Sequence, residues 1–188
     1  MDIYQPAEDS YFLAGIVSDY LKIISKSDKN KMLVLDMGAG SGIQSKNLIR
    51  FGIKKQNITA VDMNKDAINE TKKIGIKIIK SDLFGSLNKK TKFNLIIFNP
   101  PYLPEHKYDK KPDTTGGKKG DETILEFIKE LKYHLIEKGV CFLLSSSMTP
   151  ENRWKAEAKK QNLKVKIIAE KKLFFETLFV WEIKISNQ

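Results

Sequence analysis

Residues 32–42 read MLVLDMGAGSG, and this stretch decides the fold class. Its first part, 32–36, is a short apolar run closed by an acid, which is typical of a strand buried on both faces. The glycines that follow allow a tight turn into a helix at about 42–51. A buried strand that turns through glycines into a helix predicts the first unit of a doubly wound α/β sheet.

The same alternation of strand and helix continues along the chain. Apolar residues at helical spacing predict an opening helix over 7–26. Further strands are expected at 58–62, 76–80, 93–98, 140–147, 163–169 and 174–185, and further helices at 64–74 and 121–137. Glycine suits a helix C-terminus, so the long helix is expected to end at Lys138-Gly139. Proline suits the first helical position, so Thr149-Pro150 is expected to open the next helix.

Strands separated by helices pair in parallel, whereas the last two predicted strands are close enough in sequence to pair antiparallel. The fold class is therefore α/β: a doubly wound, mostly parallel seven-stranded sheet with helices on both faces and an antiparallel last strand. The 188 residues are expected to form a single domain, 1–188, which opens with an N-terminal helical segment, 1–27.

Composition excludes several classes of protein. No stretch approaches the roughly 20 apolar residues of a membrane span, and the acidic, aromatic N-terminus is no signal peptide. We therefore expect a cytoplasmic protein. The single cysteine, Cys141, lies in an apolar run and is expected to be buried. His106 and His134 are far apart and outside any ligand motif, so no metal site is expected.

The net charge of +10 is compatible with a nucleic-acid partner. The basic residues are nearly all lysines spread along the chain, however, and only Arg50 and Arg153 are arginines. Proteins that recognise nucleic-acid bases favour arginine, because its planar guanidinium group pairs bidentately with guanine. The charge thus leaves open both nucleic acid and a merely solvated, lysine-rich surface.

Acids close three successive predicted strands beside the glycine turn. Asp36 could meet a ligand's ammonium group, and Asp62 could accept hydrogen bonds from ribose hydroxyls. Asp82 could accept from an adenine amine while Leu83 packs against the ring. The glycine spacing is not that of a dinucleotide site, which needs glycine where this chain has Ile43.

The strand at 93–98 ends in Asn99-Pro100-Pro101-Tyr102. Two prolines make the turn stiff and leave the carbonyls around it free to accept. The Asn99 side-chain oxygen and the Pro100 carbonyl can jointly accept both hydrogens of an –NH₂ group, and Tyr102 offers a flat stacking face. Asn99, Pro100 and Tyr102 are the predicted catalytic residues, and with Pro101 they form the predicted substrate site. Catalysis here would consist mainly of orientation.

Together these motifs resemble the class I methyltransferase fold, which implies S-adenosyl-L-methionine (SAM) as cofactor. NPPY is typical of methyltransferases that act on planar amines and amides. The opening segment YQPAEDS, residues 4–10, is similar to that of the short archaeal and eukaryotic members of the HemK/PrmC glutamine methyltransferases. The cofactor-binding residues that the resemblance implies are Ser10, Asp36, Gly38, Gly40, Asp62, Asp82, Leu83 and Asn99.

The resemblance further implies methylation of the glutamine in the Gly-Gly-Gln motif of a class I translation release factor. It also implies a heterodimer with a small zinc-ribbon activator protein. An RNA or DNA amino methyltransferase, a protein-lysine methyltransferase and a binding module without turnover remain alternatives. We expect the strand at 76–80 to lie at a sheet edge, where a partner can add a strand, and the loop at 103–120 to close over substrate.

Overall fold

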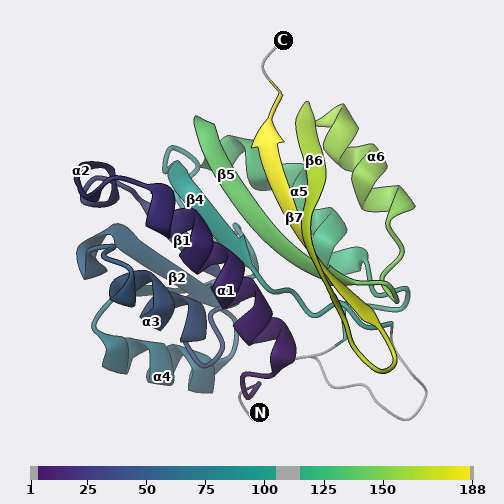
Figure 1. The fold of residues 1–188 in the computed structure, drawn as a ribbon, viewed down its shortest axis with the longest axis horizontal. Helices are drawn as coiled ribbons and strands as arrows, with labels where there is room; N and C mark the ends of the chain where they lie inside the picture. Colours follow the sequence, from purple (N-terminus) through teal and green to yellow (C-terminus); the bar gives the residue numbers. More distant parts are fainter. Residues whose placement is uncertain (1–3, 105–114, 187–188) are drawn as a thin grey trace.

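The computed structural model describes residues 4–104 and 115–186 (Figure 1). The strands are β1 (Val34–Met37), β2 (Ile58–Asp62), β3 (Lys77–Lys80), β4 (Phe93–Phe98), β5 (Leu135–Ser146), β6 (Leu163–Lys172) and β7 (Thr177–Ile185). The helices are α1 (Glu8–Ile23), α2 (Lys26–Lys29), α3 (Ile43–Arg50), α4 (Lys65–Ile74), α5 (Glu122–His134) and α6 (Asn152–Lys160), with a 3₁₀ turn η1 (Lys55–Asn57). Across these ranges, no helix has the length and apolar character needed to cross a membrane.

Within the described ranges the strands form one seven-stranded sheet in the order β3-β2-β1-β4-β5-β7-β6. The first five strands pair in parallel, and β7 pairs antiparallel with both β5 and β6. The predicted fold class is confirmed, including the antiparallel last strand and the edge position of β3. The order of strands reverses between β1 and β4, which is where open α/β sheets bind their ligands.

Helices cover both faces of the sheet. Figure 1 shows α1 crossing the near face, where it packs with α3, and α5 behind the sheet. Leu13, Val17 and Leu21 of α1 and Leu48 of α3 belong to one apolar core. The helices α5 and α6 supply a second core on the opposite face. The strands between them are therefore buried on both sides, as their continuous apolar sequences predict.

Three predicted helix boundaries are wrong. The long helix ends at His134 instead of Lys138-Gly139, because Leu135 is fully buried and already pairs with Phe93 of β4. Strand pairing thus overrides the local helical pattern, and Gly139 lies inside an irregular part of β5.

At the second boundary, α6 begins at Asn152, so Pro150 precedes the helix rather than occupying its first position. The hydroxyl of Thr149 does not cap this helix. It donates instead to the carbonyl oxygen of Tyr102 at 2.9 Å. The opening helix also ends early, at Ile23, and the short helix α2 follows with Ser25 as its N-cap.

A buried carboxyl group ties β1 to α3 across the glycine turn. Asp36 is 2% exposed, and its Oδ2 accepts hydrogen bonds from the backbone N–H and the hydroxyl of Ser45 at 3.0 and 2.5 Å. Burial raises the pKa of Asp36 from 3.8 to about 7, although the bonds from Ser45 oppose the rise. The folded chain therefore holds this proton more tightly than the unfolded chain does.

This raised pKa makes stability depend on pH. The contribution of Asp36 is fully present below about pH 4 and is lost as the pH rises through about 7. Asp36→Asn cannot ionise and still offers Ser45 an acceptor oxygen. We expect the free energy of unfolding of the variant, relative to wild type, to increase by up to about 4 kcal/mol between pH 4 and pH 8. Urea unfolding measures it, with the exposed Asp19→Asn as control; parallel stability curves would contradict the assignment.

Candidate active site

The carboxyl ends of the central strands are level with one another. Met37 of β1 lies opposite both Val61 of β2 and Phe98 of β4 in the parallel register. The residues that follow these strands therefore meet at one edge of the sheet, beside the switch in strand order. A cavity of about 640 Å³ opens there.

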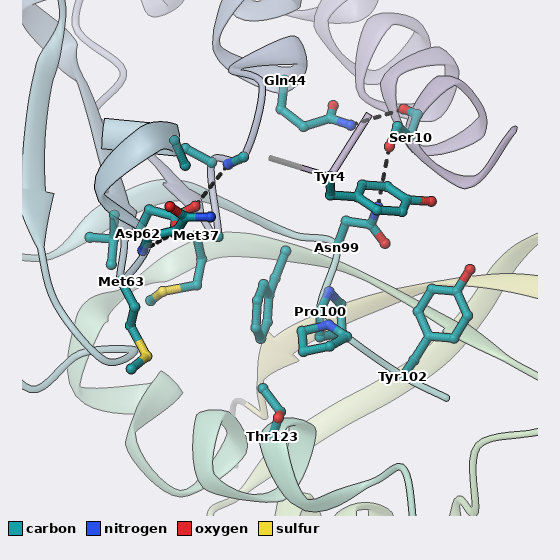
Figure 2. A pocket seen from close by; sticks show the side chains of 18 of the residues that line it. Tyr4, Ser10, Met37, Gln44, Asp62, Met63, Asn99, Pro100, Tyr102 and Thr123 are labelled. Atoms are coloured by element: carbon teal, nitrogen blue, oxygen red, sulfur yellow. Dashed lines mark hydrogen bonds between the residues drawn. The ribbon is translucent and has the colours of Figure 1, made fainter. Parts of the chain in front are cut away.

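The cavity collects nearly all of the residues that the sequence singled out. The predicted residues that line it are Ser10, Gly38, Gly40, Asp62, Asp82, Leu83, Asn99, Pro100, Pro101 and Tyr102. Figure 2 shows Asp62 and Met63 at one end and Tyr102 at the other, with Asn99 and Pro100 between them. The cavity thus has one end with predicted cofactor-binding residues and another with predicted substrate-binding residues.

Asp36 is the exception among the predicted cofactor residues. It does not line the cavity, since it is buried beneath the glycine turn with Oδ2 engaged by Ser45. The acceptor that does line this region is Gln44. Its amide nitrogen donates to the carbonyl oxygen of Ser10 at 2.9 Å, and its Oε1 is buried without a hydrogen-bond partner in the described structure.

The glycine turn is held against the end of β2. Asp62 Oδ2 accepts from the backbone N–H of Gly40 at 2.8 Å, and its Oδ1 accepts from that of Asn64 at 2.8 Å. Gly38 adopts φ +65°, and a Cβ there would come within 3.4 Å of the Phe98 ring. A contact at 3.4 Å is ordinary packing, so it is the left-handed backbone conformation that favours glycine here.

Leu83, beside Asp82 on the wall of the cavity, has a left-handed backbone with φ 43°. Bulky residues rarely adopt this conformation, and it costs on the order of 1–3 kcal/mol. The turn is held by hydrogen bonds on either side, from Gly85 N to the Asp82 carbonyl and from Ser86 N to Ser81 Oγ. Such strain is concentrated at ligand sites.

Asn99 is oriented by the opening helix. Its Nδ2 donates to Asp9 Oδ2 at 2.9 Å and lies 3.5 Å from Ser10 Oγ. Asp9 is 5% exposed, and its Oδ1 accepts from Tyr4 Oη and from the N–H and hydroxyl of Ser10. An ionised carboxylate only accepts, so it selects the amide nitrogen of Asn99. The other end of that amide, Oδ1, is buried and has no partner in the described structure.

Tyr102 is a neutral phenol in this environment. Burial raises the pKa of Tyr102 far above its ordinary value, and the negative charges of Asp9 and Glu176 raise it further. The side chain therefore offers a flat face and a hydroxyl, and it does not act as a base near neutral pH.

Neighbouring segments hold the Pro-Pro turn in place. A Cβ on Gly116 would come within 2.6 Å of the Pro101 carbonyl oxygen, and one on Gly120 within 2.9 Å of that of Tyr102. Thr149 donates to the same Tyr102 carbonyl. Residues 105–114 of the predicted 103–120 loop lie outside the described residues, so closure of that loop stays a prediction.

The cavity carries negative charge. Its described lining includes four carboxylates and neither lysine, arginine nor histidine; the four are Asp9, Asp62, Asp82 and Glu176. Glu176 Oε2 is also buried without a hydrogen-bond partner there. Among residues 4–104 and 115–186, no cluster of His, Cys, Asp and Glu is suited to hold a metal ion.

Sequence reasoning did not assign roles to Asp9, Gln44 or Glu176. Asp9 stands in the quoted opening segment, next to Ser10, and its position there was the available signal. Gln44 and Glu176 enter the cavity only through tertiary folding, and no local pattern marks them.

The comparisons with known proteins agree with this geometry. Residues 20–174 match the methyltransferase small domain family. A Methanocaldococcus jannaschii protein named as a protein N5-glutamine methyltransferase is 38% identical over 191 residues, which cover 95% of this chain and 90% of that protein. The release factor glutamine methyltransferase of Leptospira interrogans is 37% identical over 106 residues, or 52% of this chain and 35% of that longer protein.

Two solved structures share the fold. The E. cuniculi Mtq2–Trm112 complex, described as responsible for methylation of the eRF1 translation termination factor, matches with a TM-score of 0.77, 24% identity, and coverage of 99% of this chain and 100% of the other. The T. thermophilus 16S rRNA N2 G1207 methyltransferase, solved with AdoMet and guanosine, matches with a TM-score of 0.66, 19% identity, and coverage of 97% and 44%. The family match spans most of the chain and includes most of the residues that line the strand-end cavity; the chain belongs to the methyltransferase small domain family.

Proposed function

We propose that this methyltransferase uses SAM to methylate the side-chain amide of glutamine in the Gly-Gly-Gln motif of a class I release factor. The observation that carries the proposal is the orientation of Asn99. Asp9 and Ser10 engage its nitrogen, and the buried, unpartnered Oδ1 is left to accept from an –NH₂ group. The names of the M. jannaschii and L. interrogans relatives support glutamine as the acceptor.

The lining of the cavity fits this cofactor. When bound, SAM supplies an electrophilic methyl group on a positively charged sulfur. Carboxylates with no basic residue among the described lining suit a ligand that carries a sulfonium and an ammonium group. Asp62 is the candidate for the ribose hydroxyls, Asp82 and Leu83 for the adenine, and the unpaired Oε1 of Gln44 for a donor such as the ammonium.

The residues at the other end would orient the acceptor nitrogen. Asn99 Oδ1 and the Pro100 carbonyl accept its two hydrogens, and Tyr102 packs against the amide plane. Methyl transfer would form an N–CH₃ bond, break an S–CH₃ bond, and release one proton from nitrogen to solvent. The chain's contribution is orientation and exclusion of water, because no lining residue need act as a strong base.

A nucleic-acid substrate is the second candidate, favoured by the net charge of +10. The site itself argues against it. Phosphates are bound by lysine and arginine, whereas the described cavity lining presents four carboxylates. Among the described residues, the cavity lining therefore supplies no basic group for a nucleic-acid strand.

Methyl transfer from tritiated SAM tests the function directly. We expect label on the release factor from the same source, no label when its Gly-Gly-Gln glutamine is changed to alanine, and none on total RNA. Mass spectrometry of the product then separates glutamine from lysine methylation. Label confined to RNA, or retained by the glutamine-free factor, would contradict the proposal.

The cofactor assignment predicts that Asp62→Ala weakens SAM binding. The variant loses a charged acceptor for the ribose and the bond that holds Gly40. We expect about a tenfold loss of affinity, since one such hydrogen bond contributes on the order of 1–2 kcal/mol. Calorimetric titration measures it, with the exposed Asp19→Ala as control. An affinity equal to wild type would place the cofactor elsewhere.

The orientation of Asn99 makes a sharper prediction. Asn99→Ala should abolish turnover with SAM affinity nearly intact. Asp9→Asn keeps the shape of Asp9 but adds an N–H donor, which lets the Asn99 amide turn around. We expect kcat to fall by roughly 10- to 100-fold through loss of orientation, with little change in KM. Glu8→Gln, next to it and exposed, is the matched control; equal kcat values for the Asp9 and Glu8 variants would show that Asp9 does not orient Asn99.

We also propose a small zinc-ribbon activator as partner, docked on β3. This strand lies at the sheet edge, with Ile78 and Ile79 half-buried between two exposed lysines. Its outer edge can accept an added strand, and the E. cuniculi neighbour was solved with a partner, Trm112.

Co-expression with the activator should yield a 1:1 heterodimer that binds SAM more tightly than the lone chain. Ile78→Asp should prevent it, whereas Ile168→Asp, on the opposite edge strand β6, should not. Size-exclusion chromatography with light scattering separates these outcomes. A monomer that ignores the activator, or equal effects of the two variants, would argue against docking on β3.

A further inference from the structure

The hairpin between β6 and β7 ends in an unusual turn. Lys172 pairs with Thr177, and the N–H of Leu173 donates to the Glu176 carbonyl at 2.8 Å, which closes the turn over residues 174 and 175. Such central positions ordinarily hold Gly, Asn, Asp or Pro, each of which favours the turn for a local reason. Here both are phenylalanine, so turn formation does not explain them.

These two rings are the most exposed large apolar side chains of the described structure. Phe174 is 92% and Phe175 86% exposed, and the rings pack edge to face with their centroids 4.6 Å apart. They belong to neither apolar core of the described residues. Adjacent exposed aromatic side chains of this kind are typical of protein interfaces, where aromatic residues are enriched.

The turn stands at the substrate end of the cavity. Glu176, next in sequence, lines the cavity and lies close enough to raise the pKa of Tyr102. Lys171 lies just before the turn, and its Nζ is 3.4 Å from Oε1 of Glu8. Glu8 is the first residue of α1 and precedes Asp9. Figure 1 shows the hairpin end on the same side of the molecule as the start of α1.

We propose that Phe174 and Phe175 dock the polypeptide that carries the acceptor side chain into the cavity, with Glu176 pairing a donor of that polypeptide. The inference deepens the proposed function and rests on it. A chain whose side chain reaches Asn99 passes Tyr102, and Glu176, the residue that follows the two rings, lines the same cavity. Glu176 Oε2 is buried and unpartnered in the described structure, which suits a main-chain N–H or a basic side chain of the occupant.

Charge favours a polypeptide over the other occupants. A nucleic-acid strand at this point would bring phosphates against the carboxylates of Glu176 and Asp9. A second copy of the chain carries the same net charge of +10, so two copies repel each other. The carboxylates of Glu176 and Asp9 instead suit the main-chain N–H groups that a polypeptide brings.

Steady-state kinetics with the intact release factor test the docking surface. We expect the double variant Phe174→Ala/Phe175→Ala to raise KM for the factor at least tenfold while kcat and SAM affinity stay within twofold of wild type. The KM of Phe174→Leu/Phe175→Leu for the factor should lie between those of wild type and the alanine double variant. The matched control is Ile23→Ala, which removes another highly exposed apolar side chain, 81%. Ile23 is the last residue of α1 and lies roughly 20 Å along the helix from Glu8. Binding of the factor, measured by interferometry, should follow KM.

The outcomes separate the inference from the function on which it rests. No methylation of the factor by the wild-type chain would overturn both. Methylation by wild type with an unchanged KM in the double variant would overturn the docking surface alone. A wild-type dimer that the double variant dissociates, or RNA binding that it abolishes, with KM for the factor unchanged, would assign the two rings to those other occupants instead.

Discussion

The site depends on the parallel pairing of β1 with a strand on each side. Met37 is level with Val61 and with Phe98, so the chain leaves all three strands at the same height. Everything that lines the cavity from these strands follows from that register. A slip of one residue would exchange the two faces of a strand. Its side chains would then enter the wrong one of the two apolar cores on the opposite faces of the sheet, so the packing of these cores opposes such a slip.

The second constraint joins the beginning of the chain to the end of β4. Asp9 is buried, and its two oxygens accept hydrogen bonds from different residues. Oδ2 accepts from Asn99, and Oδ1 accepts from Tyr4 and Ser10. A buried carboxylate is costly unless it is hydrogen-bonded in this way. The same bonds leave Asn99 Oδ1 unsatisfied. The hydrogen bonds of Asp9 therefore hold the Asn99 side chain in one orientation, with its Oδ1 unsatisfied among the described residues. In ordinary core packing such an acceptor would be satisfied, whereas a preorganised binding site keeps it for a ligand.

Sequence patterns predicted the sheet and most of the site because both depend on local signals. Apolar runs marked the buried strands, and the acids, glycines and prolines stood where those strands end. The end of α5 was mispredicted because Leu135 pairs with a strand some 40 residues away, which a helical pattern does not register. Asp36 was placed in the ligand site because its spacing is right, and only the side-chain contact with Ser45 shows it to be buried. The left-handed backbone of Leu83 has no sequence signal, since leucine is not selected for that conformation.

The distribution of lysine explains how a chain of charge +10 keeps a negatively charged cavity. Of the five inner strands, β1, β2 and β4 contain no lysine and β5 and β7 contain one each. The two edge strands contain six: Lys77, Lys80, Lys164, Lys166, Lys171 and Lys172. Lysines on edge strands discourage unspecific pairing with other chains. These six of the 33 lysine and arginine residues thus protect the sheet edges, and their presence says little about nucleic acid. On β3 the lysines flank two half-buried isoleucines. This edge therefore repels a basic strand, but its isoleucines can contact a partner that accommodates the charges of Lys77 and Lys80.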